Sequence, residues 1–187
     1  MRIAVGIAGG SGAGKTTLAR EVAACLGECA TIVEQDWYYR DQSGVPLERR
    51  ALVNYDHPGA LETKLLVRHL RKLLAGETVE APVYDFERHT RCPETRRIAP
   101  AEVVLVEGLY VLHDAALRAL LAVKVFVGTT PGTCLARRIV RDMLERGRTA
   151  ESVTSQFETT VFPMYRRYVE PSSADADVIV HGDWSVT

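Results

Sequence analysis

GGSGAGKTT, residues 9–17, stands between an apolar run, IAVGIA (3–8), and a segment with helical periodicity, LAREVAACL (18–26). The stretch matches the pattern G-x-x-x-x-G-K-[ST], which forms a phosphate-binding loop when a strand precedes it and a helix follows. Both flanking elements are predicted here. The stretch therefore indicates an α/β fold and a site for the phosphates of a nucleoside triphosphate.

The chemistry of this loop follows from its residue types. Glycines let backbone N–H groups close around a phosphate, and the helix N-terminus adds positive potential. We expect Lys15 to reach the β- and γ-phosphate oxygens and the Thr16 hydroxyl to ligate Mg²⁺. The predicted phosphate-binding residues in this stretch are Gly9, Gly10, Ser11, Gly12, Ala13, Gly14, Lys15, Thr16 and Thr17.

Outside the loop, short apolar runs alternate with segments of helical periodicity. Runs that are apolar on both faces are typical of a parallel sheet covered by helices on each side. We therefore predict a doubly wound, mostly parallel P-loop sheet of about five strands. Residues 1–187 are expected to form one domain, with a hairpin flap at 77–98 and a lid region at 137–155. The predicted strands are 3–8, 31–35, 102–107, 122–128 and 176–182, and the predicted helices begin near 15, 60, 113, 131 and 150.

Composition excludes several classes of protein. With 187 residues and a net charge of −1, the chain has no overall basic field, which disfavours nucleic-acid binding. Its four cysteines have no zinc-like spacing, so no structural metal is expected. Arg118 and Lys124 interrupt the longest apolar stretch, which disfavours a membrane span. No signal peptide is predicted, and a reduced, cytoplasmic protein is expected.

Two acidic residues follow predicted strands. Asp36 comes directly after TIVEQ, and Glu107 ends EVVLVE. In open α/β sheets the ligand lies at the carboxyl ends of the strands, so both carboxylates should face the phosphate-binding loop. One can hold Mg²⁺ or its waters, and the other can accept a proton from an attacking hydroxyl. The local sequence does not distinguish the two roles.

A cluster of arginines occupies CLARRIVRDMLERGR (134–148), an amphipathic helix with the arginines off its apolar stripe. Such side chains often remain in solvent, and Asp142 and Glu145 can neutralise part of the cluster. A transferring phosphoryl group, however, spreads negative charge over its oxygens, which guanidinium groups stabilise. We therefore predict a lid, with Gly147 as its hinge.

Several longer motifs carry a more specific resemblance. They are GGSGAGKTT, QDWYYRD, NYDHPGAL, PVYDFERHTR, VLVEGLY, RRIVRDMLERGR, QFETTVFPMYRRYVEPS and ADVIV. In this order and at these separations, the chain closely resembles the uridine kinase (uridine–cytidine kinase) family of P-loop nucleoside kinases, nearly end to end. NYDHP, YDF-x-x-H and RD-x-x-ERGR are far more specific than the phosphate-binding loop alone.

The resemblance implies transfer of the γ-phosphoryl group of ATP or GTP to the 5′-hydroxyl of uridine or cytidine, as in pyrimidine salvage. It implies Mg²⁺ as cofactor and a homo-oligomer, a tetramer in the family. By position, Asp36 resembles the base that faces the hydroxyl, and Glu107 the acid near Mg²⁺. The catalytic set implied is Asp36, Lys15 and Arg141, and the metal set is Thr16, Glu107 and Asp36.

The resemblance also implies a nucleoside site. Asp56 resembles the residue that grips the ribose 2′ and 3′ hydroxyls. Tyr84, Phe86 and His89 resemble the pyrimidine pocket, with the two rings on one strand face. Gln156 resembles a glutamine that contacts the base edge, and Tyr39 a tyrosine that lines the site. The lid arginines implied are Arg138, Arg141, Arg146 and Arg148, of which Arg146 and Arg148 bind phosphate and Arg138 and Arg141 face the nucleoside.

Other functions use the same phosphate-binding loop. A P-loop kinase of another small alcohol, such as a phosphoribulokinase, pantothenate kinase or riboside kinase relative, would have no use for YDF-x-x-H or Gln156. A nucleoside monophosphate kinase needs cations for the acceptor phosphate, whereas these acceptor segments offer Asp56 and aromatic rings. A guanine-specific switch usually carries N/T-K-x-D, which does not occur in the sequence. The preferences for uridine or cytidine and for ATP or GTP stay open.

Overall fold

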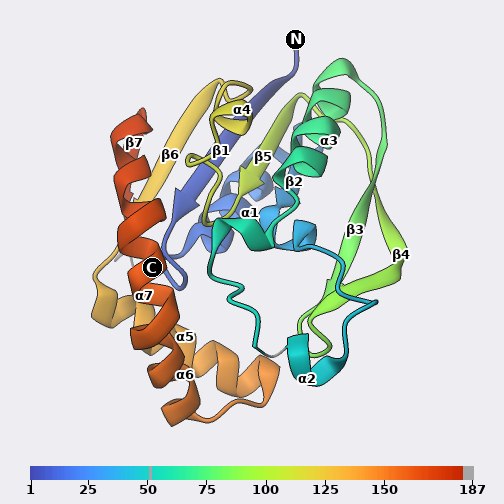
Figure 1. The fold of residues 1–187 in the computed structure, drawn as a ribbon. Coiled ribbons are helices and arrows are strands. Elements are labelled where there is room, and N and C mark those ends of the chain that lie inside the picture. The colour runs from blue at the N-terminus through green and yellow to red at the C-terminus, as the bar shows by residue number, and fades with distance from the viewer. Residues whose placement is uncertain (51, 183–187) are drawn as a thin grey trace.

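A five-stranded parallel sheet lies at the centre of the computed structural model, which describes residues 1–50 and 52–182, without the side chain of Arg146 (Figure 1). The order of its strands is β2-β5-β1-β6-β7, and each neighbouring pair is parallel. The predicted parallel sheet is therefore confirmed. Its strands are β1 (Ile3–Gly9), β2 (Ala30–Glu34), β5 (Val103–Glu107), β6 (Val123–Gly128) and β7 (Val178–His181).

Helices cover both faces of this sheet. Side chains along each strand point alternately to the two faces, and those on each face pack in a separate apolar cluster with the helices that cover it. Val104 and Val106 of β5 pack with Leu66 and Leu70 of α3 in one cluster. On the other face, Ile7 of β1 belongs to the cluster that contains α1. The helices are α1 (Lys15–Leu26), α2 (Leu47–Arg50), α3 (Thr63–Ala75), α4 (Ala115–Arg118), α5 (Pro131–Arg146), α6 (Ala150–Gln156) and α7 (Phe162–Met164).

The segment 150–169, predicted as one helix, follows a helical path that is not uniformly α-helical. Two π-helical turns, Phe157–Val161 and Tyr165–Val169, interrupt it. Each π-turn takes up more residues than an α-turn, so side chains beyond it are displaced around the axis. The periodicity of the sequence does not reveal this displacement. The displacement affects the direction in which the Thr160 side chain points, because Thr160 lies within the first π-turn.

A hairpin stands apart from the main sheet, where the sequence predicts one. Strands β3 (Val79–Asp85) and β4 (Thr90–Ile98) pair with each other as a separate antiparallel sheet. Figure 1 shows the hairpin extending beside the carboxyl ends of the central strands, opposite α5 and α6. It is therefore placed to form one wall of a site at those strand ends.

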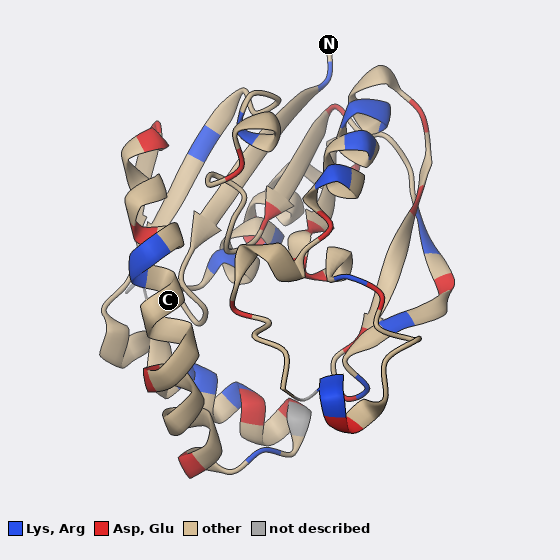
Figure 2. Ribbon diagram, in the orientation of Figure 1, with Lys and Arg blue, Asp and Glu red and all other residues tan. Residues whose placement is uncertain are grey.

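Charged residues of both signs lie close together on the same elements. Figure 2 shows basic and acidic residues interleaved along α5.

Among the helices that the structure describes, none combines the length and the apolarity that crossing a bilayer requires.

Replacing Leu70 by alanine should destabilise the fold strongly. Leu70 is completely buried between α3 and the sheet. Truncating a buried leucine removes apolar contacts and leaves a cavity, so we expect the free energy of unfolding to fall by about 2–5 kcal/mol. Urea denaturation followed by circular dichroism measures this change. Leu144→Ala, at a helix position that is 81% exposed, is the matched control and should change stability by less than about 0.5 kcal/mol.

Candidate active site

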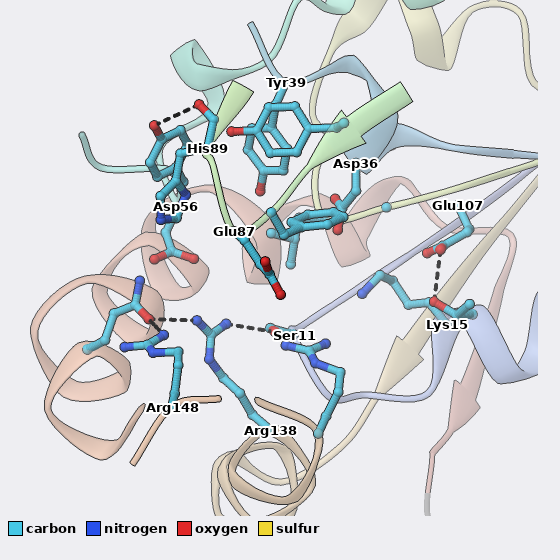
Figure 3. Close-up of a pocket in the computed structure, with 18 of the residues that line it drawn as sticks. Ser11, Lys15, Asp36, Tyr39, Asp56, Glu87, His89, Glu107, Arg138 and Arg148 are labelled. Atoms are coloured by element: carbon cyan, nitrogen blue, oxygen red, sulfur yellow. Dashed lines mark hydrogen bonds between the residues drawn. The ribbon is translucent and has the colours of Figure 1, made fainter. Parts of the chain in front are cut away.

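A cavity of about 480 Å³ lies where the parallel strands end. Its wall comes from the loop after β1 and the start of α1, the turns after β2 and β5, the segment 53–56, the hairpin, and α5 and α6 with the loop between them. Figure 3 shows side chains from these separate parts of the chain directed into one space. The predicted site residues that line it are Ser11, Lys15, Thr16, Asp36, Tyr39, Asp56, Tyr84, Phe86, His89, Glu107, Arg138, Arg141, Arg148 and Gln156.

The phosphate-binding loop has the backbone that its glycines permit. Gly12 and Gly14 have φ angles of 82° and 104°, which side-chain-bearing residues rarely adopt. A Cβ on Gly12 would lie 2.5 Å from the backbone oxygen of Cys134, so α5 packs directly against the loop. The other predicted phosphate-binding residues form this loop and the first turn of α1 rather than the cavity wall, and they are Gly9, Gly10, Gly12, Ala13, Gly14 and Thr17.

Lys15 folds back over the loop. Its Nζ donates to the carbonyl oxygen of Gly10 at 3.0 Å, and the side chain is 9% exposed. An ammonium group has three donors, and at this position it faces the cavity from the start of α1. The arrangement suits a charge that contacts phosphate oxygens, since those are acceptors.

Two acidic side chains reach the cavity from the carboxyl ends of β5 and β2. Thr16 Oγ1 donates to Glu107 Oε1 at 2.8 Å, and Glu107 is 6% exposed at the end of β5. Burial raises the pKa of Glu107, while the Lys15 ammonium opposes that shift. Asp36 lies in the 3₁₀ turn Gln35–Tyr38 that directly follows β2. Both acids therefore reach the cavity from neighbouring strand ends.

This turn is held firmly, which fixes where Asp36 points. The buried Gln35 side chain accepts a hydrogen bond from the Tyr110 backbone N–H at 2.8 Å. The Trp37 ring is 8% exposed, lies under the Arg96 guanidinium at 4.4 Å, and is not part of the cavity wall. Its bulk therefore does not crowd the space in front of Asp36.

Hydroxyl and carboxylate oxygens are the ligands that Mg²⁺ prefers, so Thr16, Glu107 and Asp36 fit this cation. Among the described residues, no group of three His, Cys, Asp or Glu side chains could hold a metal ion. Mg²⁺ does not need such a cage, because it usually binds one or two carboxylates together with waters and substrate phosphates.

Aromatic rings and one buried carboxylate form the opposite end of the cavity. The Tyr84 ring lies 5.1 Å from Tyr39 and 5.2 Å from Phe86. Tyr55, which the sequence analysis does not single out, stacks on His89 at 4.9 Å. Phe86 follows the end of β3 and so lies in the turn of the hairpin, not on a strand face as predicted. The rings still line the same cavity, because the turn folds over it.

Asp56 is the buried carboxylate at this end, with 7% exposure. Its Oδ2 accepts a hydrogen bond from Thr160 Oγ1 at 2.9 Å. The Tyr110 hydroxyl donates to its backbone carbonyl. Burial raises the pKa of Asp56, while the Arg138 guanidinium and the Thr160 hydrogen bond oppose this shift. Figure 3 shows its carboxylate directed toward the arginine side of the cavity.

The arginines of α5 are organised by an acid. Asp142 has no exposed side-chain surface. Its Oδ1 lies 2.9 Å from Arg141 Nη2, and its Oδ2 lies 3.4 Å from Arg138 Nε and 3.7 Å from Arg148 Nη1. Arg138 Nη1 also donates to Ser11 Oγ at 2.9 Å, which joins the cluster to the phosphate-binding loop. The fourth predicted lid arginine, Arg146, has a side chain outside the described part of the structure.

Gln156 bonds to the arginine cluster at the edge of the cavity. Its Oε1 accepts hydrogen bonds from Arg138 Nη2, at 2.9 Å, and from Arg148 Nη1. In this structure the amide oxygen therefore holds two guanidinium groups, although the side chain also lines the cavity.

The predicted site lacks five residues of the cavity wall, and it lacks two residues whose side chains contact that wall. The first are Val53, Tyr55, Glu87, Gly108 and Leu109, and the second are Asp142 and Thr160. Asp142 stands four residues after Arg138, which is a spacing typical of helical ion pairs and could have revealed the contact. Tyr55 precedes Asp56 in the NYDHP motif. Glu87 and Thr160 carry no such signal, because their places depend on how the hairpin and the π-turn fold.

The chain is similar to known P-loop kinases in both sequence and fold. Residues 4–183 match the model of the Phosphoribulokinase / Uridine kinase family. The chain is 46% identical to the uridine kinase of Ligilactobacillus salivarius, over 95% of this chain and 84% of that protein. It is 44% identical to the uridine kinase of Clostridium botulinum strain Okra, over 95% and 87%. The phosphoribulokinase of Rhodobacter spheroides has a similar fold, with a TM-score of 0.71, 18% identity, and coverage of 96% of this chain and 70% of that chain.

Proposed function

The chain belongs to the phosphoribulokinase/uridine kinase family, and we propose that it transfers the γ-phosphoryl group of ATP or GTP to the 5′-hydroxyl of uridine or cytidine. It is a phosphotransferase with an alcohol acceptor. The choice of a nucleoside as acceptor is supported by one observation. At the end of the cavity away from the phosphate-binding loop, a buried carboxylate, Asp56, lies beside the aromatic rings. A carboxylate accepts hydrogen bonds from neighbouring sugar hydroxyls, and ring faces stack on a base.

The reaction requires the donor and the acceptor to meet between the two ends of the cavity. The 5′-oxygen forms a bond to the γ-phosphorus as the bond from that phosphorus to the β,γ-bridging oxygen breaks, and a nucleoside diphosphate leaves. The hydroxyl proton passes to the Asp36 carboxylate. An alcohol loses its proton readily only as its oxygen bonds to phosphorus, so Asp36 orients the hydroxyl and accepts the proton late in the transfer.

Cationic groups surround the path of the transferring group. Lys15 approaches from the loop, and Arg138 and Arg141 approach from α5, held by Asp142. Charge develops on the phosphoryl oxygens in the transition state, and these prepositioned donors stabilise it. Thr16, Glu107 and Asp36 would hold Mg²⁺, which neutralises charge on the donor phosphates when bound.

A phosphate-transfer assay over several acceptors tests this function. Uridine, cytidine, adenosine, guanosine and pantothenate are each supplied with ATP and then with GTP. We expect transfer to uridine or cytidine, and nucleotide hydrolysis without acceptor should be slow. Transfer only to an acceptor without a pyrimidine would contradict the proposal and would favour a kinase of another small alcohol.

Nucleoside binding should weaken at acid pH, because Asp56 accepts hydrogen bonds fully only when it is ionised. Its pKa is raised by burial, so protonation begins at a higher pH than for an ordinary aspartate. The KM for uridine should therefore rise as pH falls through this raised pKa and be constant above it. Steady-state kinetics with uridine measures the profile, since its base carries no group that titrates on the acid side.

Asp56→Asn is the control for this profile. The amide does not titrate, so the KM of the variant should be high at every pH and should lack the rise on the acid side. An unchanged profile in the variant would assign the titration to another group, such as Glu107, whose pKa is also raised.

A further inference from the structure

We propose that Thr160 is a positioning residue that orients the Asp56 carboxylate and thereby sets the preference of this enzyme for a ribose with both hydroxyls. The proposal rests on the function proposed above, in which Asp56 binds the sugar. Thr160 lies 104 positions from Asp56 in the sequence, and the two side chains meet only in the folded protein.

The contact is a hydrogen bond with a defined direction. Thr160 Oγ1 lies 2.9 Å from Asp56 Oδ2 and 3.1 Å from the backbone oxygen of Gln156. A threonine hydroxyl has one hydrogen, so it can donate to only one of these two acceptors at a time. An ionised carboxylate is a stronger acceptor than a backbone carbonyl, so the hydrogen bond to Asp56 prevails when Asp56 is charged.

This hydrogen bond fixes one oxygen of the carboxylate. The Asp56 backbone is held separately by the Tyr110 hydroxyl, which donates to its carbonyl oxygen. Rotation about the Cα–Cβ and Cβ–Cγ bonds is the freedom left to the side chain, and the hydrogen bond from Thr160 to Oδ2 restricts it. Two neighbouring hydroxyls of one sugar require both carboxylate oxygens at set positions, whereas a single hydroxyl can follow a rotating carboxylate. The orientation therefore matters most for a sugar with two adjacent hydroxyls.

Thr160 achieves this without adding charge. Arg138 and Arg148 already act on Asp56 electrostatically, and a further cation would compete with the sugar hydroxyls for the carboxylate oxygens. A neutral hydroxyl occupies one lone pair of Oδ2 and leaves the remaining acceptor sites of the carboxylate for substrate.

The position of Thr160 depends on the π-turn Phe157–Val161. Phe157 and Val161 of this turn are buried in the core, while Thr160 is half-buried and faces Asp56. One turn earlier, the Gln156 side chain holds Arg138 and Arg148. A single stretch of helix thus supports the sugar carboxylate and the arginine cluster together. π-helical turns inside helices frequently occur at functional sites.

Thr160→Val tests the proposal, because valine keeps the shape and the β-branch but cannot donate. We expect the KM for uridine to rise about five- to tenfold, as for the loss of one typical hydrogen bond, with kcat changed by less than about twofold. The KM for 2′-deoxyuridine should change by less than about twofold. The KM for 2′-deoxyuridine divided by the KM for uridine should therefore fall. Thr160→Ser restores the hydroxyl and should restore the wild-type KM for uridine.

Thr159→Val is the matched control. Thr159 is the adjacent threonine, exposed, and its hydroxyl donates to the backbone oxygen of Ser155 at 2.7 Å. Both substitutions remove a hydroxyl that lies within hydrogen-bond distance of a helix carbonyl oxygen, but only Thr160→Val removes a bond to Asp56. Wild-type kinetics for Thr159→Val is expected.

Three outcomes would overturn the positioning role. They are a wild-type KM for uridine in Thr160→Val, an equal rise in KM for both nucleosides, and an equal effect of Thr159→Val. Thermal denaturation of each variant shows that the KM values are measured on folded protein. These outcomes are distinguishable from a failure of the proposed function. If that function is wrong, the wild type phosphorylates neither nucleoside, and the positioning role is then wrong as well.

Discussion

Asp36→Asn should lower kcat for uridine phosphorylation by about 10²–10⁴-fold, which is the range for removing a positioned general base. The asparagine keeps the shape of the side chain, and its amide can still contact a hydroxyl. It cannot take the proton that leaves the 5′-oxygen as the phosphoryl group is transferred. We therefore expect the KM for uridine to change much less than kcat.

Steady-state kinetics at saturating donor measures this effect. Asp41→Asn is a suitable control, because Asp41 is an exposed aspartate five positions later whose contacts are with Ser43 and Thr90, outside the cavity wall. Equal activity of Asp36→Asn and the wild type would remove the role assigned to this carboxylate, whatever the acceptor.

Lys15→Ala should reduce kcat/KM for the donor nucleotide by about 10²–10³-fold or more, as for the loss of one charged donor to the transition state. Lys15 lies over the loop with 9% exposure, and its Nζ is already 3.0 Å from the Gly10 carbonyl oxygen. The ammonium therefore needs little rearrangement to meet phosphate oxygens, and its removal leaves their charge uncompensated.

Initial rates with varied ATP, and then with varied GTP, measure the loss. Lys64→Ala, at an exposed position in the first turn of α3, removes a lysine outside the cavity wall and should leave kcat/KM unchanged for both donors. A wild-type kcat/KM for donor in Lys15→Ala would show that this loop does not bind the reacting phosphates. Lys15→Ala should change the KM for uridine little, because uridine binds at the other end of the cavity. The KM for uridine therefore shows whether the substitution affects only the phosphate-binding end.

The family and the central architecture were accessible from the sequence. The loop GGSGAGKTT and the apolar runs of the strands carry local signals, since a phosphate-binding loop requires its glycines and lysine at fixed spacing. The family match over residues 4–183 and the five-stranded parallel sheet confirm both expectations. The convergence of Asp36 and Glu107 was also predictable, because parallel strands end at one edge.

Other features of the site depended on packing between distant segments. The resemblance implies that Gln156 contacts the base edge, and only the structure shows that its Oε1 also accepts from Arg138 and Arg148. The sequence predicted that Asp142 neutralises part of the charge of the arginine cluster. The structure shows that its side chain is buried among three arginines.

Local patterns of residues were enough to predict the features whose chemistry lies within a few consecutive positions: the phosphate-binding loop, the apolar strands, and the acids at the strand ends. The contact of Thr160 with Asp56 and the entry of Phe86 into the cavity from a turn became known only from the folded chain. These contacts depend on the rotation of side chains past a π-turn and on the fold of a hairpin. Such rotations follow from how whole elements pack, and no local pattern of residues encodes them.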